Sequence, residues 1–190
     1  RVRPGAHPRT LHVGDAHRLR PVPGRVLGPG AGLGHRGTRD GLGLRGIKLI
    51  PHYQGRTTAN TDLTPILAWA DEQACPILNH SWDDPAKLKQ WATDFPRACF
   101  IIGHASSDFA DAVNRLPNVF QNTCAVLHKG QFEAMCQALD PDKIIYGSDF
   151  LDLDIAFGLG PILYARVPDA LKRKVLSLNP RRVFERYVAP

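Results

Sequence analysis

Three short apolar stretches of this chain each end in a side chain that can bind a metal ion. They close at His80, His104 and Asp149. Two imidazoles and a carboxylate suit Zn²⁺ or a similar divalent ion. Such an ion lowers the pKa of a bound water from about 15.7 toward about 7, and a nearby carboxylate or imidazole can then take the proton. The residue types therefore predict a site for a divalent metal ion, provided that the fold brings the three ends together.

The segments around these residues predict an alternation of strands and helices. Almost continuous apolar runs predict strands at 47–50, 75–80, 98–104, 118–122 and 143–149. Helices are predicted from Asp62 or Thr64 and from Asp84-Pro85, and over 107–116, 131–139, about 168–177 and 180–188. Apolar strands separated by helices are typical of a parallel α/β sheet. Five such units without a glycine-rich phosphate loop favour part of a (β/α)8 TIM-type barrel over a dinucleotide-binding fold.

A barrel of this kind places the carboxyl ends of all its strands on one rim. His80, His104 and Asp149 are then expected to converge, although any one of them could instead be a hydrogen-bonded strand-end residue. Lys48 and His52 share strand parity, so both can face the barrel mouth and contact substrate. The alternatives are an ion pair inside the barrel for Lys48 and a solvent-facing loop position for His52.

Residues 1–46 differ in composition from residues 47–190. They hold nine arginines, no lysine and two aspartates, a net charge of +7, whereas the remainder of the chain carries −1. Glycine and proline leave no helical or strand periodicity, so this segment is predicted to be irregular or disordered. Three origins stay open: a nucleic-acid-binding arm, which lacks aromatic residues for stacking on bases; a natural extension; and an out-of-frame reading of a GC-rich gene, which we favour.

The composition also excludes several classes of protein. No apolar stretch approaches the roughly 18 residues that a membrane span requires. The four cysteines contain no C-x-x-C pair, which argues against a zinc knuckle or a disulfide scaffold. Residue 1 is Arg and no signal peptide is visible, so we expect a missing start and a reduced, cytoplasmic setting. A small-molecule substrate is expected, with no membrane or nucleic-acid partner; the oligomeric state is not indicated.

The strand-end motifs resemble those of the amidohydrolase superfamily, in the amidohydrolase-related group that also contains metal-dependent decarboxylases. The likeness covers residues 46–188 and rests on five motifs: Gly46-Ile47-Lys48-Leu49, Pro76-Ile77-Leu78-Asn79-His80, Phe100-Ile101-Ile102-Gly103-His104-Ala105, Tyr146-Gly147-Ser148-Asp149-Phe150 and Asn179-Pro180-Arg181-Arg182-Val183-Phe184. It implies a metal-dependent (β/α)8 barrel, of which this chain supplies strands four to eight.

The resemblance also implies roles for individual residues. His80 is similar to the strand-five metal ligand, and Asp149 to the strand-eight aspartate that ligates the metal and takes a proton from the attacking water. His104 is similar to the strand-six histidine, which polarises substrate or ligates a second metal. In some members a strand-four lysine is carboxylated and bridges two metals, but Lys48 lies deep for that role.

One part of the family pattern is missing. The family has an H-x-H pair after strand one, whereas Leu19 stands where the second histidine belongs after His17. The 29 positions from His17 to Gly46 are too few for three strand–helix units of about 30 residues each. We therefore expect weakened metal binding and exposed sheet edges on the first and last strands, which favour association.

Three functional hypotheses remain open from the sequence. The first is a metal-dependent hydrolase acting on an amide, ester or lactone-like bond. The second is a metal-dependent nonoxidative decarboxylase of the same group. The third, from a different class, is a catalytically inactive fragment or interaction protein.

Overall fold

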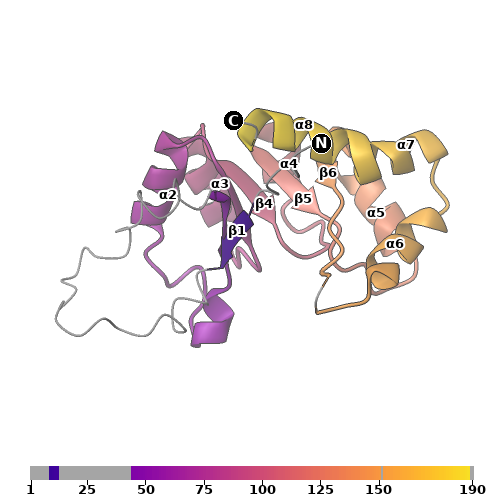
Figure 1. The fold of residues 1–190 in the computed structure, drawn as a ribbon, viewed down its shortest axis with the longest axis horizontal. Helices are drawn as coiled ribbons and strands as arrows, with labels where there is room; N and C mark the ends of the chain where they lie inside the picture. The colour runs from indigo at the N-terminus through magenta and orange to yellow at the C-terminus, as the bar shows by residue number, and fades with distance from the viewer. Residues whose placement is uncertain (1–8, 13–43, 151, 189–190) are drawn as a thin grey trace, which may run out of the picture.

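The computed structural model describes residues 9–12, 44–150 and 152–188, which form a parallel six-stranded sheet with flanking helices (Figure 1). The strands follow one another in sequence order: β1 Arg9–His12, β2 Leu44–Leu49, β3 Pro76–Asn79, β4 Cys99–Ile102, β5 Val119–Asn122 and β6 Ile144–Ile145. Every neighbouring pair is parallel. The α/β class and the partial-barrel architecture predicted from the sequence are confirmed.

Helices and short turns connect the strands. They are η3 Pro51–Gln54, α2 Thr64–Glu72, α3 Pro85–Asp94, α4 Ala110–Arg115, α5 Gln131–Ala138, η4 Pro141–Lys143, α6 Ile155–Leu163, α7 Asp169–Arg173, the π-helical turn η5 Lys174–Leu178 and α8 Asn179–Tyr187. Asp84 caps α3 by accepting hydrogen bonds from the backbone N–H groups of Ala86 and Lys87. The apolar helix α6 was not predicted, because two glycines and Pro161 interrupt its sequence.

Two apolar clusters hold the sheet on its two faces. On one face, alternate strand residues pack against α2, α3, α4 and α5; they include Ile47, Ile77, Phe100, Val119 and Ile144. On the other face, Cys99, Phe120 and Ile145 pack against Val183 and Tyr187 of α8. Burial of both faces explains why the strands are continuous apolar runs. No helix in the described part of the chain is long and apolar enough to cross a membrane.

The structure corrects the expectation that residues 1–46 are irregular throughout. Arg9–His12 form β1 and residues 44–46 belong to β2, so the strand predicted at 47–50 begins three residues earlier. β1 pairs with β2, so β2 has a neighbour on that side, contrary to the predicted exposed edge. Strand pairing uses backbone N–H and C=O groups, which any sequence offers, so a composition without strand periodicity does not exclude a strand. The Asp15–Leu19 segment lies outside the described residues.

The observed strands also end earlier than the predicted ones. β3 ends at Asn79, β4 at Ile102 and β6 at Ile145. His80, His104 and Asp149 therefore lie in the loops that follow the strands. A side chain at this position projects from the carboxyl edge of the sheet, where (β/α)8 enzymes build their sites.

Candidate active site at the carboxyl edge of the sheet

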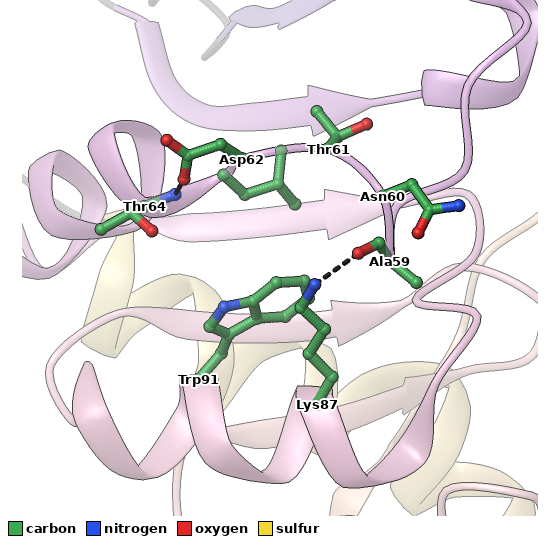
Figure 2. Close-up of a pocket in the computed structure, with 8 residues that line it drawn as sticks. Ala59, Asn60, Thr61, Asp62, Thr64, Lys87 and Trp91 are labelled. Carbon is green, nitrogen blue, oxygen red and sulfur yellow. Dashed lines mark hydrogen bonds between the residues drawn. The ribbon is translucent and has the colours of Figure 1, made fainter.

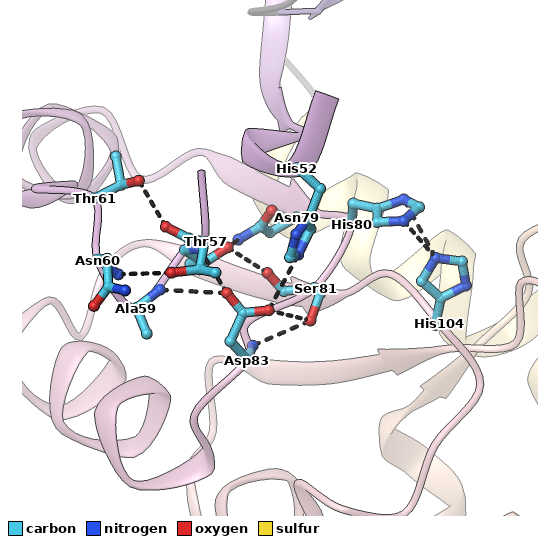
Figure 3. Close-up of polar contacts among 11 residues, drawn as sticks. His52, Thr57, Ala59, Asn60, Thr61, Asn79, His80, Ser81, Asp83 and His104 are labelled. Carbon is cyan, nitrogen blue, oxygen red and sulfur yellow. Dashed lines mark hydrogen bonds and ion pairs between the residues drawn. The ribbon is translucent and has the colours of Figure 1, made fainter. Parts of the chain in front are cut away.

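His80 and His104 lie side by side just beyond β3 and β4 (Figure 3). The Nε2 atom of His104 is 3.2 Å from Nδ1 and 3.1 Å from Nε2 of His80. The two rings are perpendicular, with centroids 4.2 Å apart. The Nε2 atom of His104 is thus almost equally distant from the two ring nitrogens of His80. The structure thus brings together two side chains that are 24 residues apart in sequence.

Gly103 makes this close approach possible. A Cβ atom at this position would lie 2.4 Å from the backbone oxygen of Asn79 and 2.9 Å from that of His80. Carbon atoms do not approach carbonyl oxygens so closely, so no other residue fits without moving the β3 end. The glycine in the Gly-His motif therefore has a steric role that places His104 beside His80.

Asp149 occupies the same edge at the β6 end of the sheet. Its φ of 56° is in the left-handed region, and its carbonyl accepts hydrogen bonds from the N–H groups of Asp152 and Leu153 at 3.1 and 2.9 Å. Burial lowers the pKa values of His80, His104 and Lys48, and the negative charge of Asp149 opposes this shift in all three. The carboxylate is thus within electrostatic reach of all three cationic or basic side chains.

Lys48 extends this group from β2. Burial lowers the pKa of its ammonium, although Cys124, Asp149 and Asp152 oppose that shift. Burial also raises the pKa of the Cys124 thiol to about 12, and the charge of Asp149 and a hydrogen bond to it add to this effect. Cys124 is therefore a protonated thiol at neutral pH and is not available as a nucleophile or metal ligand in that form.

The two imidazoles have lowered pKa values. For His80 the main cause is burial, followed by the charges of His104, Lys48 and His52, while Asp149 opposes the shift. For His104 burial dominates, Asp149 opposes it and Lys48 adds to it. Both rings are therefore neutral near pH 7, which is the form that can bind a cation or accept a proton.

His52 lies in η3, next to His80. Its ring centroid is 6.0 Å from that of His80, and Tyr53 lies at the same distance on the exposed side. The Nε2 atom of His52 is 3.1 Å from Oδ1 of Asp83. Thus the structure places Lys48, His52, His80, His104 and Asp149, all five candidate residues, along one edge of the sheet.

The sequence around this edge matches a known protein family. The amidohydrolase family model matches residues 35–186 of the chain, which include all of these side chains. The chain belongs to the amidohydrolase family. No curated protein matches its sequence closely enough to add a nearer relative.

Solved structures that resemble this amidohydrolase chain share its fold at low sequence identity. An uncharacterised TIM-barrel protein from Bordetella bronchiseptica is 15% identical, with a TM-score of 0.69 over 83% of this chain and 63% of that one. For 4-oxalomesaconate hydratase from Rhodopseudomonas palustris the values are 18%, 0.57, 87% and 63%. For 5-carboxyvanillate decarboxylase from Sphingomonas paucimobilis they are 14%, 0.56, 76% and 59%. The present chain thus spans less than two thirds of the length of these proteins.

Amidohydrolases are generally metal-dependent, and the donors at this edge fit a divalent ion in kind. A tetrahedral ion about 2.0–2.1 Å from its ligands needs them roughly 3.3 Å apart, close to the observed spacing of the histidine nitrogens. Within the described ranges, however, no three His, Cys, Asp or Glu side chains are grouped closely enough to hold one ion. The donor types and the spacing of the two histidine nitrogens fit the family's metal. In the described residues, no third side chain of these types lies close enough to complete the ligand set.

A hollow of about 330 Å³ lies between the loop after η3 and helix α3 (Figure 2). It is lined by the loop at 59–64 and by Lys87 and Trp91 of α3. The Lys87 ammonium donates to the carbonyl of Ala59 and lies 5.0 Å from the centroid of the Trp91 ring. The Lys87 ammonium is thus already engaged within the protein, and none of the predicted site residues lines the hollow. The convergent side chains, rather than this hollow, mark the candidate site.

Sequence reasoning missed two residues of the edge, Asp83 and Tyr53. The sequence does contain a signal for Asp83. Two aspartates, Asp83 and Asp84, precede Pro85, and one carboxylate is enough to cap the helix, so the other is free for a different role. Tyr53 gave no such signal, since an isolated aromatic residue after a proline is common in loops. Trp82 and Trp91 are buried in the core and do not belong to the edge.

Proposed function

We propose that this amidohydrolase chain belongs to a metal-dependent hydrolase that cleaves an amide, ester or lactone-like bond of a small molecule. The observation that supports this most strongly is the contact of His80 with His104 at the carboxyl edge of the sheet, with the charge of Asp149 acting on both rings. In (β/α)8 enzymes, residues far apart in the sequence meet at this edge and build a common reaction centre. The activity and substrate of the complete protein are part of this proposal.

In this proposal His80 and Asp149 hold a divalent cation, with His104 alongside. When bound, the cation supplies positive charge that acidifies a water molecule and polarises the substrate carbonyl. Zn²⁺ fits a donor set of imidazole and carboxylate, and Mn²⁺ or Fe²⁺ are alternatives with the same donors.

The protein side chains have separate tasks in the reaction. The Asp149 carboxylate accepts the proton of the attacking water and later returns it to the leaving group. The neutral His104 imidazole donates a hydrogen bond to the substrate oxygen on which charge develops. Lys48 binds an anionic group of the substrate through its ammonium, and His52 contacts the substrate at the same edge.

Nonoxidative decarboxylation is a second candidate. Two of the solved structures with this fold are decarboxylases, of 5-carboxyvanillate and of 2,6-dihydroxybenzoate, and both of those names denote aromatic carboxylates. A carboxylate-binding ammonium such as that of Lys48 serves this chemistry as well as hydrolysis. A cytoplasmic location is proposed together with either activity.

A substrate panel with matched variants tests the proposal. The purified protein, stripped with a chelator and reloaded with Zn²⁺ or Mn²⁺, is assayed against aryl esters, lactones, anilides and hydroxybenzoates. We expect turnover of one class that requires the metal and is lost in Asp149→Asn, while Asp111→Asn on the outer surface of α4 retains it. Turnover that survives chelation, or that survives Asp149→Asn, would contradict the proposed chemistry. Binding without turnover of any class would favour the interaction-protein alternative.

A further inference from the structure

Asp83 is held in an unusual backbone conformation next to the candidate site. Its φ is 59°, in the left-handed region that residues with a Cβ atom seldom adopt. Its backbone N–H donates to the Ser81 hydroxyl at 3.1 Å, and this hydroxyl donates to Asp83 Oδ1 at 2.8 Å. A strained conformation persists only where the surroundings fix it, and strained residues cluster at functional sites.

The two carboxylate oxygens of Asp83 accept hydrogen bonds from different groups (Figure 3). Oδ2 accepts hydrogen bonds from the backbone N–H groups of Thr58 at 2.6 Å and of Ala59 at 3.3 Å. Oδ1 accepts from the Ser81 hydroxyl and faces Nε2 of His52 at 3.1 Å. One oxygen therefore fixes the loop after β2, and the other fixes the imidazole that this loop carries.

The support behind this contact is itself buried. Thr58 is fully buried; its hydroxyl donates to the carbonyl of Ser81 and accepts from the Asn79 side-chain amide at 3.0 Å. These bonds tie the loop after β2 to the loop after β3 independently of His52. The Asp83 carboxylate is thus presented to His52 from a rigid base.

The neighbouring aspartate shows that the arrangement is specific to Asp83. Asp84 accepts from the N–H groups of Ala86 and Lys87 and caps α3. Asp83 contributes nothing to that cap and directs its carboxylate to the loop after β2 instead. Helix capping therefore does not account for the second carboxylate.

We infer that Asp83 is a positioning residue that fixes His52 with its proton on Nε2 and its Nδ1 edge turned to the candidate site. This inference deepens the proposed function, in which His52 binds substrate. An ionised carboxylate can only accept a hydrogen bond, so the nitrogen that faces it must carry the proton. Burial raises the pKa of Asp83, but the bonds from Ser81, Ala59 and Thr58 and the charge of His52 lower it further, which keeps the group ionised at neutral pH.

The test is ¹⁵N NMR of the histidine rings in the full chain, without metal or substrate. His52 is assigned by comparison with His52→Gln. We expect the wild-type His52 ring to be protonated at Nε2 when it is neutral. Asp83→Asn is isosteric and can still accept from Thr58 and Ala59, yet it can present an N–H donor to His52; the ring should then move to the Nδ1–H form.

The control is Thr58→Val, which removes the hydroxyl bonds behind the loop and leaves the Asp83 carboxylate in place. It should lower the melting temperature without changing the His52 tautomer. An Nδ1–H form in the wild-type protein overturns the inference, whether or not the variants fold. A His52 tautomer unchanged in folded Asp83→Asn overturns it as well. Neither outcome depends on metal binding or turnover, so a failure here is distinct from a failure of the proposed function.

Discussion

Two aspartates stand at opposite ends of the candidate site, and both have left-handed backbone conformations. Asp83 has a φ of 59° and Asp149 a φ of 56°. Asp83 accepts hydrogen bonds from Thr58, Ala59 and Ser81 and faces His52. The carboxylate of Asp149 instead meets the Cys124 thiol, and its charge reaches His80, His104 and Lys48.

This difference separates a group that organises the site from a group that can react in it. A carboxylate whose lone pairs are filled by backbone N–H groups is a poor base and a poor metal ligand, because those bonds must break first. The Asp149 carboxylate instead acts through its charge on the imidazoles and the ammonium that line the same edge. We therefore expect the Asp83 carboxylate to hold the loops after β2 and β3 in place and the Asp149 carboxylate to take part in the reaction.

Replacement of Asp149 or of His104 should have the largest effect on activity. With a substrate identified from the panel, Asp149→Asn and His104→Asn should each reduce kcat by about 100-fold or more, the usual scale for loss of an acid–base group. The melting temperatures of both variants should stay close to that of the wild type. Near-normal turnover in His104→Asn would show that this ring is structural.

Substitution of Gly103 should lower the stability of the fold. In Gly103→Ala the new Cβ would lie 2.4 Å from the backbone oxygen of Asn79, so the β3 and β4 ends must separate. Overpacking of this kind costs about 1–3 kcal/mol of unfolding free energy. Urea denaturation measures this cost. Gly160→Ala, where nothing lies near the added atom, is the matched control and should be neutral or slightly stabilising.

Loss of the Asp83 carboxylate should lower stability by a smaller amount. Asp83→Ala leaves the N–H groups of Thr58 and Ala59 and the Ser81 hydroxyl without this acceptor. Since its side chain is 20% exposed, water can replace part of the loss, and we expect about 1–2 kcal/mol. Equal stability of Asp83→Ala and wild type in urea denaturation would show that the network carries no stabilising energy.

The same carboxylate predicts a pH dependence of stability. The pKa of Asp83 is lower in the folded protein than its ordinary value, so its ionised form stabilises the fold. This contribution is complete above the unfolded-state pKa of about 3.9 and is lost as the pH falls through the lower, folded-state value. Wild type should therefore lose its stability advantage over Asp83→Asn on acidification below about pH 4, as measured by melting curves from pH 6 to 3. A constant difference across that range would contradict the assigned direction.

The sequence was sufficient for the repeating strands and helices, and for the edge on which the candidate residues lie. Continuous apolar runs such as Phe100–Ile102 are typical of strands covered on both faces, and parallel strands place their carboxyl ends together. The sequence could not predict β1, because backbone pairing leaves little trace in side-chain pattern. It also could not predict the Asp83–His52 contact, which joins two loops through positive-φ geometry that no local pattern encodes.

The shared metal role of His80 and Asp149 is the central claim, and metal analysis of the purified chain tests it most directly. The protein, His80→Ala, Asp149→Ala and the matched Asp83→Asn are loaded with Zn²⁺, dialysed and analysed by inductively coupled plasma mass spectrometry. We predict similar metal content in the wild type and in Asp83→Asn, and a clear loss in both His80→Ala and Asp149→Ala. Unchanged metal content in those two variants would contradict the assignment of this edge as the metal site.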